Sequence, residues 1–395
     1  MLKLFATVSI FIFSISTHAT QKFERALIFS GGAFNTATLL GTLEGARQMD
    51  RNPDVLISTC GGSIAAAIAY FIPDSAGQKR FLKSPAFHRL LRSVTMTDYA
   101  TAGGVAELVT SMKIDAARDV IPDIFREYLM NMPTGFPLDG PFERRDLSII
   151  MVGARLDYGP YAAGHKRAGG KLYNEVFFTD PETAQLIDGM PSPIAAQFPN
   201  SAVSTRTTAI TRYSVAQALR ASISDMFYMT PQKLDDDYYI TGAIDNYPIE
   251  LAHQAANEVI ATFREPFAFH EQAAVAATFR YDMNARIRHY HAQYADYWID
   301  FSDRLKKIQN LGPVIGFDVQ DPWLFAVAPL VGLSESVHFK MGTPEDLAEY
   351  ARMVDVQWEY ARARTVEALK RPMLDDQRHI RMIQKNNRPE YRVQP

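Results

Sequence analysis

A serine beside a strand-to-helix turn is the residue of this 395-residue chain best suited to chemistry. The apolar run that begins at Val55 ends near Gly61 and Gly62, and Ser63 then precedes an alanine-rich segment of high helix propensity. A serine at such a turn is lifted off the edge of the sheet, next to helix amides that favour negative charge. The pattern therefore predicts Ser63 as a nucleophile.

Small residues after an earlier strand are suited to complete such a site. The apolar run 26–29 is followed by Ser30, Gly31, Gly32 and Ala33, and a helical pattern begins at residue 37. Small residues leave backbone amides uncovered beside a helix start, as an oxyanion hole or a phosphate cradle requires. We therefore predict an oxyanion loop at 31–33, although Gly-Gly pairs are also common in ordinary strand-to-helix turns.

Cysteine and histidine residues give weaker signals. Cys60 is the only cysteine, so no internal disulfide is possible. Its place just before the Gly-Gly-Ser turn suits a nucleophile, whereas a lone cysteine at a strand end is more often a small buried hydrophobic residue. His289 and His291 are two residues apart and would point to different faces of a helix, which does not favour a metal site. We expect no metal and no other cofactor.

The composition is that of a globular protein with a large core. Hydrophobic residues make up 47% of the chain, and 41 basic against 44 acidic residues give a net charge of −3. This balance removes the electrostatic attraction on which nucleic-acid binding depends. Nucleic acid is therefore excluded as the expected partner.

The first residues have the pattern of a secretory signal. Lys3 precedes an apolar run that ends at Ser16, and Thr17-His18-Ala19 is a small-x-small cleavage site. A membrane anchor is the alternative, but the run is shorter than the roughly 20 residues of a spanning helix. We expect residues 1–19 to be removed and the mature chain, without a transmembrane helix, to be exported to the periplasm or secreted.

Alternating strand and helix patterns over residues 24–262 predict a three-layer α/β domain with a mostly parallel central sheet. Residues 263–372 read as a helical C-terminal extension, in which a helix beginning at Pro344 docks on this domain. The polar tail 373–395 is expected to be disordered. The apolar segment Pro322–Leu333 is interpreted as buried core or, alternatively, as the lining of an acyl-chain pocket or a transient contact with a membrane surface.

Three motifs in their order resemble the patatin-like phospholipase family. They are SGGAFN at 30–35, GGSIA at 61–65, and ASISD at 221–225 followed by TGAIDNYP at 241–248. The family has a glycine-rich oxyanion loop, a Gly-x-Ser-x-Gly elbow and an Asp-Gly-Gly/Ala motif. Its members hydrolyse ester-linked acyl chains of lipids with a Ser-Asp dyad and without a metal.

The resemblance covers residues 24–262 and implies a bacterial, exported lipid acyl hydrolase. It assigns the nucleophile to Ser63, the oxyanion loop to Gly31, Gly32 and Ala33, and the elbow to Gly61, Gly62 and Ala65. Lipids or other carboxylic esters are the substrates that it implies.

One departure from the family bears directly on the chemistry. Thr241 occupies the position of the catalytic aspartate, and a threonine hydroxyl cannot act as the base. Loss of the carboxylate from a serine protease triad costs on the order of 10⁴ in turnover. Candidates for a substitute base are Asp245, which is best placed, Asp225, and a histidine such as His165 or His253. The sequence thus predicts a serine acyl hydrolase with a substitute base or, alternatively, a pseudoenzyme that binds lipid or a protein partner in the former cleft.

Overall fold

The computed structural model describes residues 21–31, 35–133, 135–267, 269–301, 317–319, 339–341 and 343–370. The predicted signal at 1–19, the apolar segment Pro322–Leu333 and the tail 373–395 lie outside the described residues, so the interpretations of these segments stay predictions. Gly32 and Ala33 of the predicted oxyanion loop also lie outside them.

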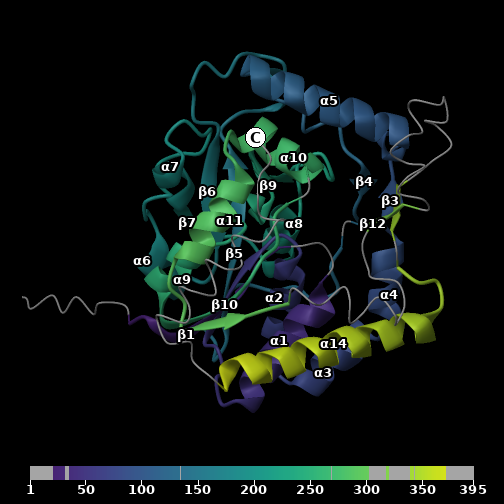
Figure 1. Cartoon of the computed structure of the whole chain (residues 1–395), viewed down its shortest axis with the longest axis vertical. Coiled ribbons are helices and arrows are strands. Elements are labelled where there is room, and N and C mark those ends of the chain that lie inside the picture. Colours follow the sequence, from purple (N-terminus) through teal and green to yellow (C-terminus); the bar gives the residue numbers. More distant parts are fainter. Residues whose placement is uncertain are drawn as a thin grey trace, which may run out of the picture.

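A nine-stranded sheet lies at the centre of the part of the chain that the structure describes (Figure 1). Its strands are β1 (Phe23–Phe29), β2 (Val55–Thr59), β5 (Ser148–Leu156), β6 (Tyr173–Phe178), β7 (Thr208–Ile210), β8 (Gln232–Leu234), β9 (Asp237–Ile240), β10 (Ala256–Thr262) and β11 (Tyr297–Ile299). The main path runs β11-β10-β1-β2-β5-β6-β7, while β9 pairs with β5 and β8. All pairs from β11 to β5 are parallel, and β6 and β9 run antiparallel to β5.

Two short antiparallel pairs lie outside this sheet. They are β3 (Thr95–Met96) with β4 (Met130–Asn131), and β12 (Phe317–Val319) with β13 (Phe339–Met341).

Helices cover both faces of the sheet, which confirms the predicted three-layer α/β fold. Successive strand residues face opposite cores, so Leu27 and Phe29 of β1 lie in one core and Ala26 and Ile28 in the other. The first core is closed by α1 (Thr36–Gln48), α2 (Gly62–Phe71), α3 (Ser75–Leu82), α4 (Pro85–Arg92), α8 (Val215–Ser222) and α14 (Leu347–Leu369). The second is closed by α5 (Ala102–Arg118), α6 (Pro181–Ile187), α7 (Pro193–Gln197), α9 (Ile249–Ala255), α10 (Phe269–Phe279) and α11 (Met283–Ala292).

The antiparallel strand β9 positions the site. Strand β2 pairs with β5 as far as Val152, and β9 pairs with β5 from Ala154 onward. Since β6 occupies the other edge of β5 over this stretch, β9 takes the place beside β5 that β2 leaves when it ends. The carboxyl ends of β2 and β9 therefore meet head to head.

The C-terminal extension is not only helical, because β11 adds a parallel strand to the sheet beside β10. Helix α14 lies along α1, as Figure 1 shows, and a Cβ added at Gly41 would be only 2.4 Å from the carbonyl oxygen of Trp358. The predicted docking of this helix is thus confirmed. Its predicted start is wrong: α14 begins at Leu347, because the Asp346 carboxylate accepts the Glu349 amide and caps the helix there.

Among the described residues, no helix is both long enough and apolar enough to cross a bilayer.

Candidate active site

Cys60, and not Ser63, occupies the turn between β2 and α2. Its φ is +49°, in the left-handed region that residues other than glycine rarely adopt. Helix α2 begins at Gly62, where a Cβ would be 2.0 Å from the carbonyl oxygen of Phe29, so only glycine lets the helix start this close to β1. A strained residue on a sharp strand-to-helix turn is the geometry of a nucleophile elbow.

The structure contradicts the expected exposure of Ser63. This side chain lies in the first turn of α2 and is 0% exposed. Its hydroxyl is 2.8 Å from the hydroxyl of Ser222 and 3.2 Å from that of Ser58. Because Ser222 donates its own proton to the carbonyl of Val152, Ser63 donates to Ser222. The partners of Ser63 are therefore hydroxyls and not a base, and its place is in a buried network that ties α2 to α8.

The Cys60 thiol has a carboxylate partner. It donates to Oδ2 of Asp225 over 2.8 Å, and the Cys60 amide donates to the hydroxyl of Ser222 over 3.1 Å. The Thr241 hydroxyl donates to the other oxygen of Asp225 and accepts the amide of Ala243. Asp225 is half-buried and Cys60 is 7% exposed. The Cys60 thiol, the Asp225 carboxylate and the Thr241 hydroxyl thus form one continuous hydrogen-bond network.

This hydrogen-bond network forms because β2 and β9 end at the same point of the sheet. Thr241 directly follows β9, and Cys60 directly follows β2. A Cβ added at Gly242 would be 2.6 Å from the Cys60 nitrogen, so the turn after β9 packs tightly against the elbow. The Thr241 amide also donates to the carbonyl of Ser224, which holds the Asp225 loop beside it.

The predicted oxyanion loop lies next to Cys60, but Gly31 does not offer its amide there. A Cβ added at Gly31 would be 3.0 Å from the Cβ of Cys60, which places this first residue of the predicted loop against the elbow. The Gly31 amide, however, donates to Thr59 Oγ1 at 2.6 Å and to Asn246 Oδ1 at 3.2 Å. The predicted role of Gly31 as an oxyanion donor is therefore wrong for this geometry.

The start of α2 supplies other donors. Within the described part of the chain, the amides of Gly61 and Gly62 form no backbone or side-chain hydrogen bond. They follow Cys60 directly, at the helix end where the backbone dipole favours negative charge. Ala65 is fully buried in the body of α2 and packs in the core, away from the turn.

Asp245 is not the base that the sequence suggested. It is fully buried, its two oxygens accept from the Arg286 guanidinium at 3.1 and 3.0 Å, and one of them also accepts the Tyr247 amide. Burial raises the pKa of Asp245, and the Arg286 cation opposes that rise. The histidines suggested as bases are engaged elsewhere, His165 with the carbonyl of Ala162 and His253 with that of Tyr294.

Comparison with known families agrees with this geometry. The model of the patatin-like phospholipase family matches residues 27–253, more than half of the chain. The chain belongs to this family. Patatin-like proteins are generally lipid acyl hydrolases, and the match runs from β1 to within α9, so it includes Cys60, Asp225 and Thr241. A search of curated proteins finds no match for this patatin-like chain.

The family motif fits the structure three residues earlier than the sequence suggested. In the patatin-like Gly-x-Ser-x-Gly elbow, Ser58 takes the place of the first glycine, Cys60 that of the serine, and Gly62 is the final glycine. Sequence reasoning ranked both functional candidates lower: it named Asp225 as a substitute base behind Asp245, and it favoured a buried structural role over a nucleophilic one for Cys60. A signal for Cys60 was present, because the five-residue run 55–59 ends directly before it.

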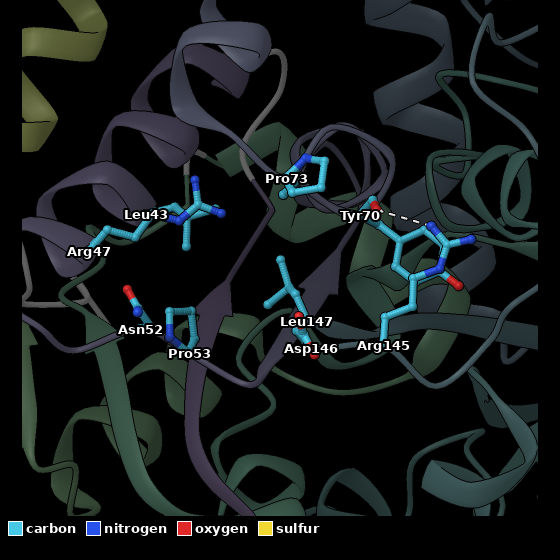
Figure 2. A pocket seen from close by; sticks show the side chains of 10 residues that line it. Leu43, Arg47, Asn52, Pro53, Tyr70, Pro73, Arg145, Asp146 and Leu147 are labelled. Atoms are coloured by element: carbon cyan, nitrogen blue, oxygen red, sulfur yellow. Dashed lines mark hydrogen bonds between the residues drawn. The ribbon is translucent and has the colours of Figure 1, made fainter.

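A cavity of about 800 Å³ lies away from this elbow. Figure 2 shows that Arg47 and Arg145 approach it from opposite sides, with Tyr70 beside Arg145. Its walls come from the carboxyl ends of α1 and α2 and from the loops before β2 and β5. These loops lie at the edge of the parallel strands opposite Cys60, whereas ligands of open α/β sheets bind at the carboxyl ends of the strands. Burial lowers the pKa of Arg47, but Glu44 and Asp74 lie near enough to oppose it.

Proposed function

We propose that this patatin-like protein hydrolyses carboxylic esters of lipids with Cys60 as nucleophile and Asp225 as base. The observation that carries the proposal is the thiol on the strained turn, 2.8 Å from a carboxylate oxygen. A thiol is a far stronger acid than a hydroxyl and is intrinsically more nucleophilic, so it needs less help from a base. A cysteine therefore suits an elbow in which the family aspartate has become Thr241.

The chemistry follows from the two partners of Asp225. As the sulfur attacks the ester carbonyl carbon, Asp225 accepts the thiol proton. The tetrahedral intermediate expels the alcohol, which takes the proton from Asp225, and a thioester remains on Cys60. Water then attacks the thioester with Asp225 as base, and the carboxylic acid leaves as the sulfur recovers its proton. Thr241 is a positioning residue, since its hydroxyl holds the carboxylate.

The oxyanion of the intermediate would meet the first amides of α2. In strand-to-helix elbows the amide of the residue after the nucleophile is a standard oxyanion donor. Gly61 holds that position, and Gly62 follows it. An oxyanion donor that is fixed before the reaction is worth about 3–4 kcal/mol in a serine protease. This assignment replaces the predicted use of Gly31.

The test is to trap the acyl-enzyme with p-nitrophenyl octanoate. We expect an octanoyl adduct by mass spectrometry on the peptide that contains Cys60, and its release by neutral hydroxylamine, which cleaves thioesters faster than oxygen esters. Cys60→Ala should lower kcat/KM by about 10³-fold or more. Ser63→Ala is the matched control and should change it less than about 3-fold, because Ser63 contacts neither Cys60 nor Asp225 through its side chain. An adduct on Ser63 that survives in Cys60→Ala would overturn the proposal.

The pseudoenzyme that binds lipid or a protein partner is the second candidate. The observations that favour it are the internal hydrogen bonds of the Gly31 amide and the threonine in place of the family aspartate. Absence of both the adduct and any turnover, with intact folding and lipid binding, would select this alternative.

Export is part of the proposal. The pattern Lys3 to Ala19 supports cleavage after Ala19, with periplasmic or secreted mature protein and transient contact with membrane surfaces. Mass spectrometry of the protein isolated from its native compartment tests this: the mature chain should begin at Thr20. An intact N-terminus in the cytoplasmic fraction would contradict it.

A further inference from the structure

An apolar pocket of about 250 Å³ lies beside the first turn of α2, the helix that follows the elbow. Ile64 and Ile223 belong to its wall and connect it to the site, because Ile64 lies in the first turn of α2 and Ile223 two residues before Asp225. Further apolar lining comes from α4, α8 and the segment before residue 137, namely Phe87, Leu90, Leu91, Met132, Phe136 and Leu219.

One cation also lines this apolar pocket. Arg220 lies in the last turn of α8, and its guanidinium donates to the hydroxyl of Ser224. Among the residues that the structure describes, no carboxylate pairs with it, and burial lowers the pKa of Arg220 without any acidic group that opposes the change. A desolvated cation in an apolar wall is costly unless a partner or a ligand neutralises it.

The one carboxylate of the lining is already engaged. Asp139 accepts the amides of Gly140 at 2.8 Å and of Ala216 at 3.0 Å, so it satisfies the amino end of α8. Ala216 lies one helical turn before Arg220. Asp139 therefore lies at the amino end of α8, and Arg220 lies in its last turn. Of the two charged groups, Arg220 is the nearer in sequence to Ile223 and Asp225.

We propose that this pocket binds a single-chain anionic amphiphile, whose chain lies against α4 and α8 and whose carboxylate or phosphate pairs with Arg220. That this ligand is a substrate or product rests on the proposed function; its binding does not. Sites for drug-sized ligands usually measure about 300–1,000 Å³, so a pocket of about 250 Å³ suits one short chain better than a two-chain lipid. A fatty acid and a lysolipid phosphate share this chemistry.

The test uses calorimetric titration with eight-carbon probes that differ in their head groups: octanoate, octyl phosphate and 1-octanol. All are titrated into the Cys60→Ala variant, so that turnover does not enter. We expect at least one anion to bind about 10-fold more tightly than octanol, and the stronger of the two identifies the head group. Acetate and inorganic phosphate alone should bind at least about 100-fold more weakly than their octyl counterparts, because the chain supplies most of the binding.

Three variants separate recognition from folding. Arg220→Gln should remove the preference for the anion while leaving the affinity for octanol within about 3-fold, and Arg220→Lys should keep part of the preference because it keeps the charge. Leu90→Asp should weaken all three probes. Arg126→Gln, at an exposed arginine outside the pocket, is the matched control and should change nothing.

Equal binding of octanoate, octyl phosphate and octanol to Cys60→Ala would overturn the proposal, as would an anion preference that survives in Arg220→Gln or absence of binding by every probe. If the protein prefers the anionic probes but forms no acyl adduct, the proposed ligand of this pocket is supported and the proposed function is contradicted. If an acyl adduct forms but the probes bind without a preference for the anion, the proposed function is supported and the proposed ligand of the pocket is contradicted.

Discussion

At the scale of single residues, the proposed site depends on Thr241, which we assign to the position of the family's catalytic aspartate. The Thr241 hydroxyl donates to Asp225, whose other oxygen accepts the Cys60 thiol. In the proposed mechanism, the carboxylate therefore comes from the loop that contains Asp225, and Thr241 orients it. The proposal thus gives the elbow a carboxylate although residue 241 is a threonine.

The role of Thr241 can be measured directly. Thr241→Val removes a hydrogen bond to a charged carboxylate, which is worth about 1.5–3 kcal/mol, so kcat should fall about 10- to 100-fold with little change in KM. Thr241→Ser keeps the hydroxyl and should retain most of the activity. Steady-state kinetics with p-nitrophenyl octanoate give both numbers. If the valine and serine variants behaved alike, Thr241 would have only a packing role.

Glu175 leads to a second prediction at the residue scale, which concerns how the stability of the fold depends on pH. Its side chain is buried in β6, and burial, reinforced by the negative charge of Asp245, raises the pKa of Glu175 from 4.5 to about 8. The folded state then holds a proton that the unfolded chain releases, so stability falls as the pH rises from about 4.5 to about 8. The contribution reaches at most about 1.4 kcal/mol per pH unit.

Glu175→Gln should flatten this part of the stability profile and stabilise the protein at pH 7 to 8. Urea unfolding of both proteins between pH 5 and 8 measures it. Glu107→Gln, at an exposed glutamate, is the control and should leave the slope unchanged. A wild-type curve parallel to that of Glu175→Gln would show that Glu175 does not carry the proton.

At the scale of elements, the site depends on two chain ends that meet beside β5. The turn after β9 packs on the elbow so closely that a Cβ at Gly242 would lie 2.6 Å from the Cys60 nitrogen and 2.8 Å from the Thr59 Cα. These neighbours are backbone atoms and cannot turn aside as a side chain can. Gly242→Ala must therefore push the two turns apart.

We expect Gly242→Ala to cost about 1–3 kcal/mol in unfolding free energy and to lower turnover more than stability alone explains, because it separates Asp225 from Cys60. Denaturant unfolding and kinetics below the melting transition test the two effects. Gly159→Ala, where an added Cβ meets nothing within 4 Å, is the control. Full activity of folded Gly242→Ala would contradict the tight coupling of the two turns.

The elements themselves were largely predictable from the sequence, and the site was not. Buried apolar runs such as 26–29 and 55–59 identify strands, and the glycines after them identify tight turns. The position of the elbow within residues 59–63 depends on where α2 packs on β1. Hydrophobic periodicity does not determine it, and the sequence-based prediction of Ser63 was three residues away from Cys60, which has the positive φ.

Long-range partners were equally out of reach of the sequence. Cys60 and Asp225 are 165 positions apart, and their pairing follows from β9 taking the place that β2 leaves. The inward direction of the Gly31 amide likewise depends on Asn246, which is 215 positions away. The acidic motif around Asp245 suggested catalysis, whereas its partner Arg286 lies in a helix that the sequence only placed in an extension.

At the scale of the whole molecule, the C-terminal extension is part of the same folded body as the patatin-like domain. Strand β11 completes the sheet, and α14 shares one core with α1 and α2, the helix that carries the elbow glycines. Trp358 is 2% exposed, and its backbone lies against Gly41 of α1. The extension therefore supports the helix layer behind Cys60, and none of its described residues takes part in the proposed chemistry.

Trp358→Ala should consequently cost about 3–5 kcal/mol in unfolding free energy while the activity per folded molecule at low temperature stays unchanged. Because α14 belongs to the common core, unfolding followed by circular dichroism and by turnover should give a single coincident transition. Tyr161→Ala, at a side chain that is 95% exposed, is the control and should fall within about 0.5 kcal/mol of the parent protein. Loss of α14 in a separate, earlier transition that leaves the elbow active would instead show that the extension folds as an independent unit.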